Sequence, residues 1–169
     1  MIVYLLAAIS VDGKIAQHTN QNSMEWTSKE DVQFFVKKSK EIGALIMGKT
    51  TYATIGKPLK DRVIYVLSPS VEQETPVEGV YFVSGKPEEI LKRVKDDGHS
   101  SVLIAGGASV YSQFLSQGLV DELFLTVEPY LFGSGIPLYT EGAPIKLELV
   151  SVDRLGPQAL LLHYRKHLV

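Results

Sequence analysis

The sequence predicts an α/β fold in which a mostly parallel β-sheet ends in an antiparallel hairpin. Over the first two-thirds of the chain, short apolar runs rich in β-branched residues alternate with amphipathic stretches, as in a parallel sheet with helical crossovers. The last apolar runs follow one another with no helix between them, and Gly156 and Pro157 separate the final two as a hairpin turn would. No linker or repeat divides the chain, so residues 1–169 are expected to form one domain.

Each expected strand is a short apolar run bounded by polar or turn-forming residues. The strands are expected at residues 3–9, 44–47, 63–67, 80–83, 102–104, 122–128, 146–152 and 159–164. Amphipathic segments predict helices at residues 29–41, 50–55, 87–97 and 109–117.

The helix at residues 29–41 has the clearest boundary signals. Thr27 followed by Glu30 matches a capping box, in which two side chains satisfy free backbone N–H groups, and Gly43 is placed to end the helix. Side chains at helical spacing would form its buried stripe: Val32, Phe35, Val36 and Ser39.

The composition is that of an ordinary globular protein, with 45% hydrophobic and 21% charged residues. The net charge of -2 and the lack of like-charge runs argue against nucleic acid or an anionic membrane as partner. The absence of cysteine excludes disulfides and thiolate chemistry, and it fits a cytoplasmic location. The apolar N-terminus lacks signal-peptide features and is too short to span a bilayer, so we interpret it as a buried strand.

Residues 43–50 match the nucleotide-binding pattern G-x-x-x-x-G-K-S/T letter for letter. A phosphate loop of that kind follows a strand, and its four middle residues wrap the phosphates. Here the preceding residues have a helical pattern, and residues 44–47 form an apolar strand. The segment therefore favours a buried strand, and a P-loop NTPase is only a remote alternative.

Two strand-to-helix turns are candidate anion sites. Residues 48–51, Gly-Lys-Thr-Thr, combine free N–H groups, a helix dipole and a lysine charge. Residues 105–110 contain a glycine pair that would let the backbone approach a pyrophosphate, although the full Rossmann fingerprint is missing. Either turn alone fits an ordinary connection, but together, at one edge of a parallel sheet, they would suit the separate phosphates of a dinucleotide.

Asp31 is the candidate for binding and polarising a substrate. It falls in the first turn of a helix, four residues before Phe35, so both side chains lie on one face. A buried carboxylate can accept two hydrogen bonds from the N–C–NH2 edge of a pterin or aminopyrimidine, and burial raises its pKa in a way that suits protonation of a ring nitrogen. The competing interpretation is an acidic residue that only stabilises the helix dipole.

The order of these motifs closely resembles dihydrofolate reductase over residues 2–126. The matching motifs are residues 7–15 (AAISVDGKI), 22–26 (NSMEW), 31 (D), 34–35 (FF), 46–52 (IMGKTTY), 55–59 (IGKPL), 67–68 (LS), 106–107 (GG), 110–111 (VY) and 125–126 (LT). Residues 10–16 (SVDGKIA) and 128–139 (EPYLFGSGIPLY) are more similar to the reductase domain of riboflavin biosynthesis, a sister group with the same fold.

The resemblance implies a single-domain, three-layer dihydrofolate-reductase-like fold and an NADPH-dependent oxidoreductase that needs no metal. Its NADPH-binding residues would be Ala8, Ile15, Gly48, Lys49, Thr50, Thr51, Leu67, Ser68, Gly106, Gly107, Ala108, Ser109 and Val110. Its substrate pocket would comprise Asp31, Phe35, Ile55 and Arg62, with Asp31 as the catalytic residue. Residues 17–26 would close over the nicotinamide, and the riboflavin-type relatives imply a homodimer.

Two reductase functions follow from the resemblance, both by direct hydride transfer to a pteridine- or aminopyrimidine-class substrate. The first is reduction of 5-amino-6-(5-phosphoribosylamino)uracil or a related compound, at a C=N or sugar-imine carbon. The second is dihydrofolate reduction, which Asp31 and Arg62 favour and residues 133–139 do not. Ala108 and Ser109 stand where dihydrofolate reductases usually have Gly-Arg, which removes one positive charge from the second phosphate turn.

Overall fold

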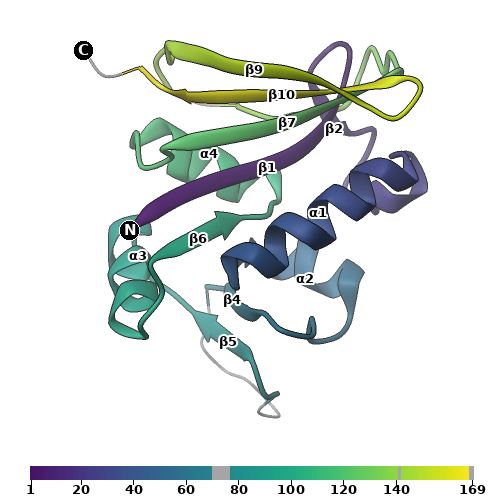
Figure 1. Cartoon of the computed structure of the whole chain (residues 1–169). Coiled ribbons are helices and arrows are strands. Elements are labelled where there is room, and N and C mark those ends of the chain that lie inside the picture. The colour runs from purple at the N-terminus through teal and green to yellow at the C-terminus, as the bar shows by residue number, and fades with distance from the viewer. Residues whose placement is uncertain (70–76, 141, 168–169) are drawn as a thin grey trace.

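Among the residues that the computed structural model describes, 1–69, 77–140 and 142–167, an eight-stranded sheet has the order β5-β4-β3-β6-β1-β7-β10-β9 (Figure 1). All pairings from β5 to β7 are parallel, whereas β10 pairs antiparallel with both β7 and β9. The strands are β1 (Ile2–Ser10), β3 (Ala44–Gly48), β4 (Val63–Leu67), β5 (Val80–Val83), β6 (Ser101–Ile104), β7 (Glu122–Glu128), β9 (Leu147–Leu155) and β10 (Ala159–Lys166). The predicted mixed sheet with a C-terminal antiparallel hairpin is confirmed.

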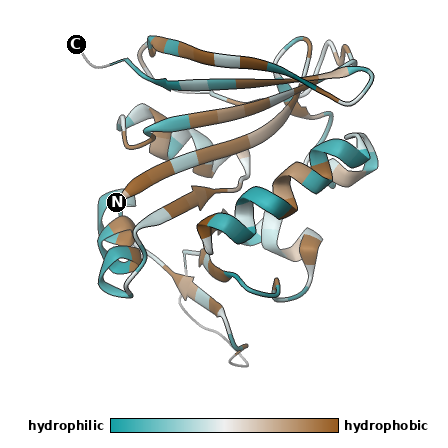
Figure 2. Ribbon diagram, in the orientation of Figure 1, coloured by the Kyte–Doolittle hydropathy of each residue, from teal (hydrophilic) through white to brown (hydrophobic). Residues whose placement is uncertain are grey.

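Helices cover both faces of this sheet. They are α1 (Lys29–Ile42), α2 (Lys49–Ile55), α3 (Pro87–Asp96) and α4 (Ala108–Ser116). Apolar residues of α1 and α2 pack into one core cluster, and those of α3 and α4 pack into another. Figure 2 shows apolar residues concentrated along the central strands between these two layers. The three-layer α/β arrangement predicted from the sequence is therefore confirmed.

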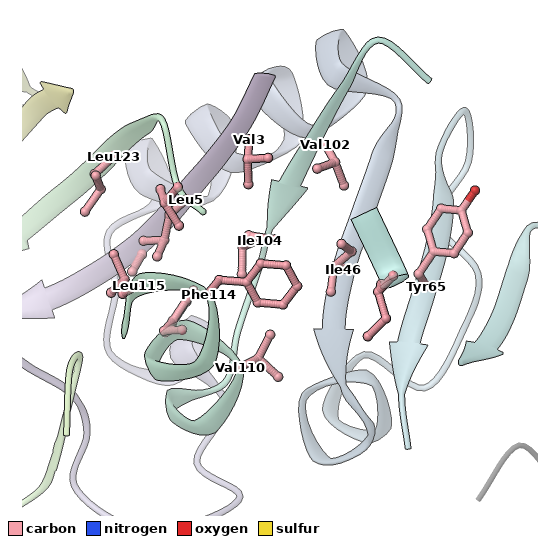
Figure 3. Packing of buried hydrophobic residues seen from close by; sticks show 14 of the residues in the cluster. Val3, Leu5, Ile46, Tyr65, Val102, Ile104, Val110, Phe114, Leu115 and Leu123 are labelled. Carbon is pink, nitrogen blue, oxygen red and sulfur yellow. The ribbon is translucent and has the colours of Figure 1, made fainter. Parts of the chain in front are cut away.

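The larger core cluster lies between the sheet and α4. Phe114 is fully buried there, among residues of β1 and β6 such as Val3, Leu5 and Ile104 (Figure 3). These side chains come from alternate positions of their strands, as expected for a sheet that buries both faces. The packing holds α4 against the centre of the sheet. None of the helices in the described ranges is long and apolar enough to cross a bilayer.

The N-cap of α1 is Ser28, so the predicted capping box of Thr27 and Glu30 is wrong. Ser28 Oγ accepts a hydrogen bond from the N–H of Asp31 at 3.2 Å. Thr27 and Ser28 are both good capping residues, and local sequence cannot choose between neighbours of similar propensity. The choice shifts the third helical position from Glu30 to Asp31.

The predicted buried stripe of α1 is also partly wrong. Val36 is 39% exposed, whereas Phe34 packs against the core beside Phe35. The end of the helix is as predicted, because Gly43 takes the left-handed conformation that glycine favours, with φ of 81°.

A second, two-stranded sheet was not predicted. It pairs β2 (Lys14–Ala16) with β8 (Ile136–Pro137), and both strands are too short to show a period in the sequence. The Asp12 carboxylate accepts hydrogen bonds from the N–H groups of Phe132 and Gly133, at 3.0 and 2.8 Å. The Ser10 hydroxyl and these N–H groups lower the pKa of Asp12 to about 2. This contact joins the turn after β1 to the segment after β7.

Candidate active site

A cavity of about 720 Å³ lies at the carboxyl ends of the parallel strands. Its walls are formed by the first residues of α2 and α4, by the residues that end β4 and β5, and by the segment from β2 to residue 23. Ligands of open α/β sheets bind at this edge, because the strand-to-helix turns present free backbone groups there. The volume is within the usual range for cofactor and substrate pockets.

Two glycine turns meet in the wall of this cavity. The N–H of Gly48 donates to the carbonyl of Gly106 at 2.8 Å, which ties the turns before α2 and α4 together. A Cβ on Gly48 would lie 3.3 Å from Val110 Cγ2, and one on Gly107 would lie 3.1 Å from Thr51 Oγ1. The close approach therefore depends on glycine. Neither helix has a side-chain cap, so no capping side chain occupies the N–H groups of its first turn.

Every residue expected to bind NADPH lines this cavity except Ala8. The structure thus brings together residues from β2, from the turns after β3 and β6, and from the end of β4. Residues 18–21 and Ser23 of the expected closing loop also line it. Their role in cofactor binding stays a prediction.

The apparent phosphate loop at residues 43–50 is not a loop. Gly43 ends α1, and residues 44–48 are strand β3, whose apolar residues are fully buried and paired with β4 and β6. No backbone between the two glycines is therefore free to wrap a phosphate. This geometry supports the strand interpretation and removes the basis for a P-loop NTPase.

Asp31 is a buried carboxylate with an oxygen that lacks a hydrogen-bond partner among the described residues. Only 5% of the residue is exposed, and its Oδ1 has no hydrogen-bond partner among the described residues. The same holds for Thr126 Oγ1, Thr27 Oγ1 and Trp26 Nε1. Burial raises the pKa of Asp31, although the nearby hydroxyl of Thr126 favours the charged form. Buried polar atoms are rarely left unpaired, so this group has the character of a site prepared for a polar ligand.

Tyr111 is the cavity residue whose pKa responds to the charge of Asp31. Its side chain lines the cavity, and its hydroxyl donates to the carbonyl of Leu6 at 2.8 Å. Burial raises the pKa of Tyr111, and the charge of Asp31 raises it further. The charge of Asp31 therefore acts on a residue of the cavity wall, although Asp31 itself does not line the cavity.

The other predicted substrate residues are farther from the cavity. Phe35 and Ile55 pack into the core cluster beneath α1 and α2, and neither lines the cavity. Arg62 donates from its Nη1 to Ser39 Oγ at 2.9 Å and from its Nε to the Lys60 carbonyl at 3.1 Å. The structure thus does not bring Arg62 to the cavity, and its predicted role in binding a substrate carboxylate stays a prediction.

The expected closing loop is anchored at its C-terminal end. Trp26 is 8% exposed and packs edge-on against Phe132, with ring centroids 4.9 Å apart, and against Tyr130 at 6.1 Å. A short 3-10 turn, η1 (Ser23–Glu25), precedes it. Of residues 17–26, the part lining the cavity therefore lies before this anchor.

The family model for dihydrofolate reductase matches residues 2–128. The chain belongs to the dihydrofolate reductase family. This match confirms the resemblance expected from the motif order. The family is a family of reductases. The uncharacterized protein YwjB of Bacillus subtilis (strain 168) is 31% identical over 169 residues, covering 95% of each chain.

Two solved structures extend the similarity of fold to the C-terminal third. A provisionally named riboflavin biosynthesis protein from Shewanella sp. PV-4 has a TM-score of 0.86 and 23% identity, covering 99% of this chain and 100% of its own. The diaminohydroxyphosphoribosylaminopyrimidine deaminase/5-amino-6-(5-phosphoribosylamino)uracil reductase from Thermotoga maritima has a TM-score of 0.77 and 21% identity. It is matched over 98% of this chain and 56% of its own length. Both structures share the fold of this chain.

Sequence reasoning assigned no role to Thr126 or Glu128. Both lie on β7 two positions apart, so they project from the same face of the sheet. Both are buried polar residues, and the residues between Glu122 and Thr126 of the same strand are apolar. Polar residues two positions apart could have been recognised in the sequence, but only the structure shows that this face of β7 meets the start of α1.

Proposed function

We propose that this protein is an NADPH-dependent reductase of the riboflavin-biosynthesis type, acting on 5-amino-6-(5-phosphoribosylamino)uracil or a related pteridine- or aminopyrimidine-class compound. The observation that carries the reductase assignment is the cavity at the carboxyl ends of the parallel strands, which is lined by all but one of the residues expected to bind NADPH. The buried Asp31 carboxylate suits the edge of either candidate substrate and does not separate the two. The names of the two solved structures, which extend the match beyond residue 128, support the substrate class.

The cavity fits a phosphorylated dinucleotide. The Gly48 and Gly107 turns line the cavity where α2 and α4 begin, with no side-chain cap on either helix, and Lys49 supplies a positive charge beside them. Ser68, at the end of β4, is the residue we assign to the adenosine 2′-phosphate region. When bound, NADPH would supply the hydride, and the chain would supply positioning and electrostatics.

Asp31 would bind and orient the substrate ring. Its free Oδ1 can accept an N–H from an aminopyrimidine edge, and the hydroxyl of Thr126 can bond the same ring. Because burial raises the pKa of Asp31, a larger fraction of the carboxyl holds a proton near neutral pH than for an exposed aspartate. That proton is the one the site can give to the nitrogen of the reacting bond while the carbon takes the hydride. This is a ring nitrogen in a pteridine C=N bond and the exocyclic nitrogen in a sugar imine.

A dihydrofolate reductase is the second candidate, favoured by the buried Asp31 carboxylate with the Thr126 hydroxyl near it. Methotrexate separates the two functions, because a folate site accepts its diaminopteridine on the carboxylate. Binding of methotrexate to the NADPH complex, lost in Asp31→Asn, would favour dihydrofolate as substrate. Failure to bind would favour the riboflavin-type substrate.

We also propose a homodimer that forms through one face of the β9–β10 hairpin, at the edge of the sheet. Leu149 and Val152 of β9 are 53% and 52% exposed, and Leu160 of β10 is 41% exposed. In the antiparallel register, Leu149 and Val152 pair with residues of β10 that lie an even number of positions from Leu160. All three side chains therefore project from one face of the sheet. Multi-angle light scattering is expected to give twice the monomer mass. Val152→Glu should reduce it to the monomer mass, because a buried unpaired charge is costly.

Lys49→Gln is expected to weaken NADPH binding roughly tenfold, because it removes a charged partner of the phosphates. Trp26, the only tryptophan, reports binding through its fluorescence, with energy transfer to the nicotinamide. Lys57→Gln is the matched control, since Lys57 is exposed outside the cavity lining. A wild-type protein that responds to ATP and not to NADPH would contradict the proposal.

A further inference from the structure

Glu128 is a buried carboxylate that the proposed chemistry does not use. It ends β7, is 2% exposed, and forms no ion pair within the described residues. An uncompensated buried carboxylate is costly, so its retention calls for hydrogen-bonding partners that need it. Its partners both belong to one residue at the start of α1.

The Oε1 atom of Glu128 accepts two hydrogen bonds from Ser28. The backbone N–H donates at 2.8 Å and the hydroxyl donates at 2.7 Å. Because the hydroxyl proton points to Glu128, the oxygen lone pairs remain free to accept the N–H of Asp31, which lies 3.2 Å away. Glu128, Ser28 and Asp31 thus form one connected chain of hydrogen bonds.

This chain replaces half of a normal capping box. In a capping box, the carboxylate of the third helical residue bonds back to the N–H of the N-cap residue. In α1 the N-cap is Ser28 and the third residue is Asp31, but the N–H of Ser28 is bonded to Glu128 instead. The Asp31 carboxylate is thereby released from capping, and its Oδ1 remains without a partner.

We propose that Glu128 is a positioning residue for Asp31: it takes over the capping bond at Ser28 and so keeps the Asp31 carboxylate directed to the substrate. The role of this arrangement in substrate binding rests on the proposed function, whereas the hydrogen bonds themselves do not depend on a ligand. Thr126, two residues earlier on the same face of β7, lies beside the carboxylate that Glu128 releases. A single strand therefore both holds the helix turn and contributes a hydroxyl to the pocket.

The electrostatic surroundings of Asp31 agree with this role. The charged group that acts on it is Glu128 from β7, and the hydroxyls of Thr126 and Thr27 lie beside it. The charge of Asp31 acts in turn on Tyr111 from α4. Burial raises the pKa of Asp31 most, and the charge of Glu128 raises it further. If Asp31 turned to cap Ser28, a backbone N–H would instead favour its charged form and lower its pKa.

Two substitutions at Glu128 separate the effect of its side-chain length from the effect of its charge. Glu128→Asp keeps the charge but withdraws the carboxylate by one methylene from Ser28, so Asp31 should take the capping bond. Glu128→Gln keeps an oxygen within reach of Ser28 but removes the charge. The titration of Asp31 is followed by carbon-13 NMR of protein labelled at the aspartate carboxyl carbons, without cofactor or substrate, with Asp31→Asn providing the assignment. Glu122→Asp, also on β7, is the matched control.

The titration midpoint of Asp31 is expected to fall to lower pH in Glu128→Asp and to fall less in Glu128→Gln, while Glu122→Asp leaves it in place. A midpoint in Glu128→Asp equal to that of the wild type would overturn the inference and leave Glu128 as a structural residue. A fall in Glu128→Gln alone would also overturn it, because loss of the Glu128 charge would then explain the whole effect. Since no NADPH is present, failure of the proposed function shows up separately, in the Trp26 titration.

Discussion

Asp31→Asn is expected to lower substrate turnover by roughly 100- to 10,000-fold, the usual contribution of a positioned acid–base group. Asparagine has nearly the same shape, but it cannot carry the shared proton, and its NH2 group replaces an acceptor. NADPH affinity should change little, because Asp31 does not line the cavity. The measurement is single-turnover oxidation of NADPH with the substrate identified by screening. Asp96→Asn, an exposed change on α3, is the control.

The same substitution is expected to stabilise the protein at neutral pH. Burial raises the pKa of Asp31 above its unfolded value, so the folded state favours the protonated form. The stability associated with that proton is present below the unfolded pKa of about 3.9 and is lost as the pH rises through the folded pKa. The melting temperature of Asp31→Asn minus that of the wild type should therefore increase from acid to neutral pH. A difference that is constant with pH would contradict this account of the pocket.

Phe114→Ala is expected to lower the free energy of unfolding by about 3–5 kcal/mol, the usual cost of removing a buried phenylalanine ring. Phe114 is fully buried between α4 and the sheet, beside Leu5 and Ile104 (Figure 3), and the close packing there leaves little scope for collapse into the void. Urea denaturation measures the change.

The control for this core variant is Leu131→Ala. Leu131 is 77% exposed, and its truncation should change the stability by less than about 0.5 kcal/mol. Because α4 begins with Gly107 as its cap, Phe114→Ala should also weaken NADPH binding by loosening the wall of the cavity. Equal stabilities for the two variants would show that α4 is held in place by other contacts.

The sequence by itself determined the succession of strands and helices. β-Branched runs such as residues 63–67 favour a strand and show no helical pattern. Gly43 and Gly156 end their elements with positive φ angles, which glycine adopts readily. The order of motifs also identified the family, and the two glycine turns located the cavity edge. These signals are local, so they need no knowledge of which segments meet.

The tertiary structure alone decided what surrounds Asp31. Thr27 and Ser28 cap a helix almost equally well in isolation, and it is Glu128, 100 positions away, that bonds to Ser28 and orients its hydroxyl. The pairing of β2 with β8 likewise joins segments far apart in the chain, and Asp12 bonds across the same two segments. Hydrogen bonds between distant residues leave no periodic trace, since either partner alone is an ordinary polar residue. The local pattern placed Asp31 on its helix, whereas the bond from Ser28 N–H to Glu128, which leaves the Asp31 carboxylate out of the cap, could be seen only in the structure.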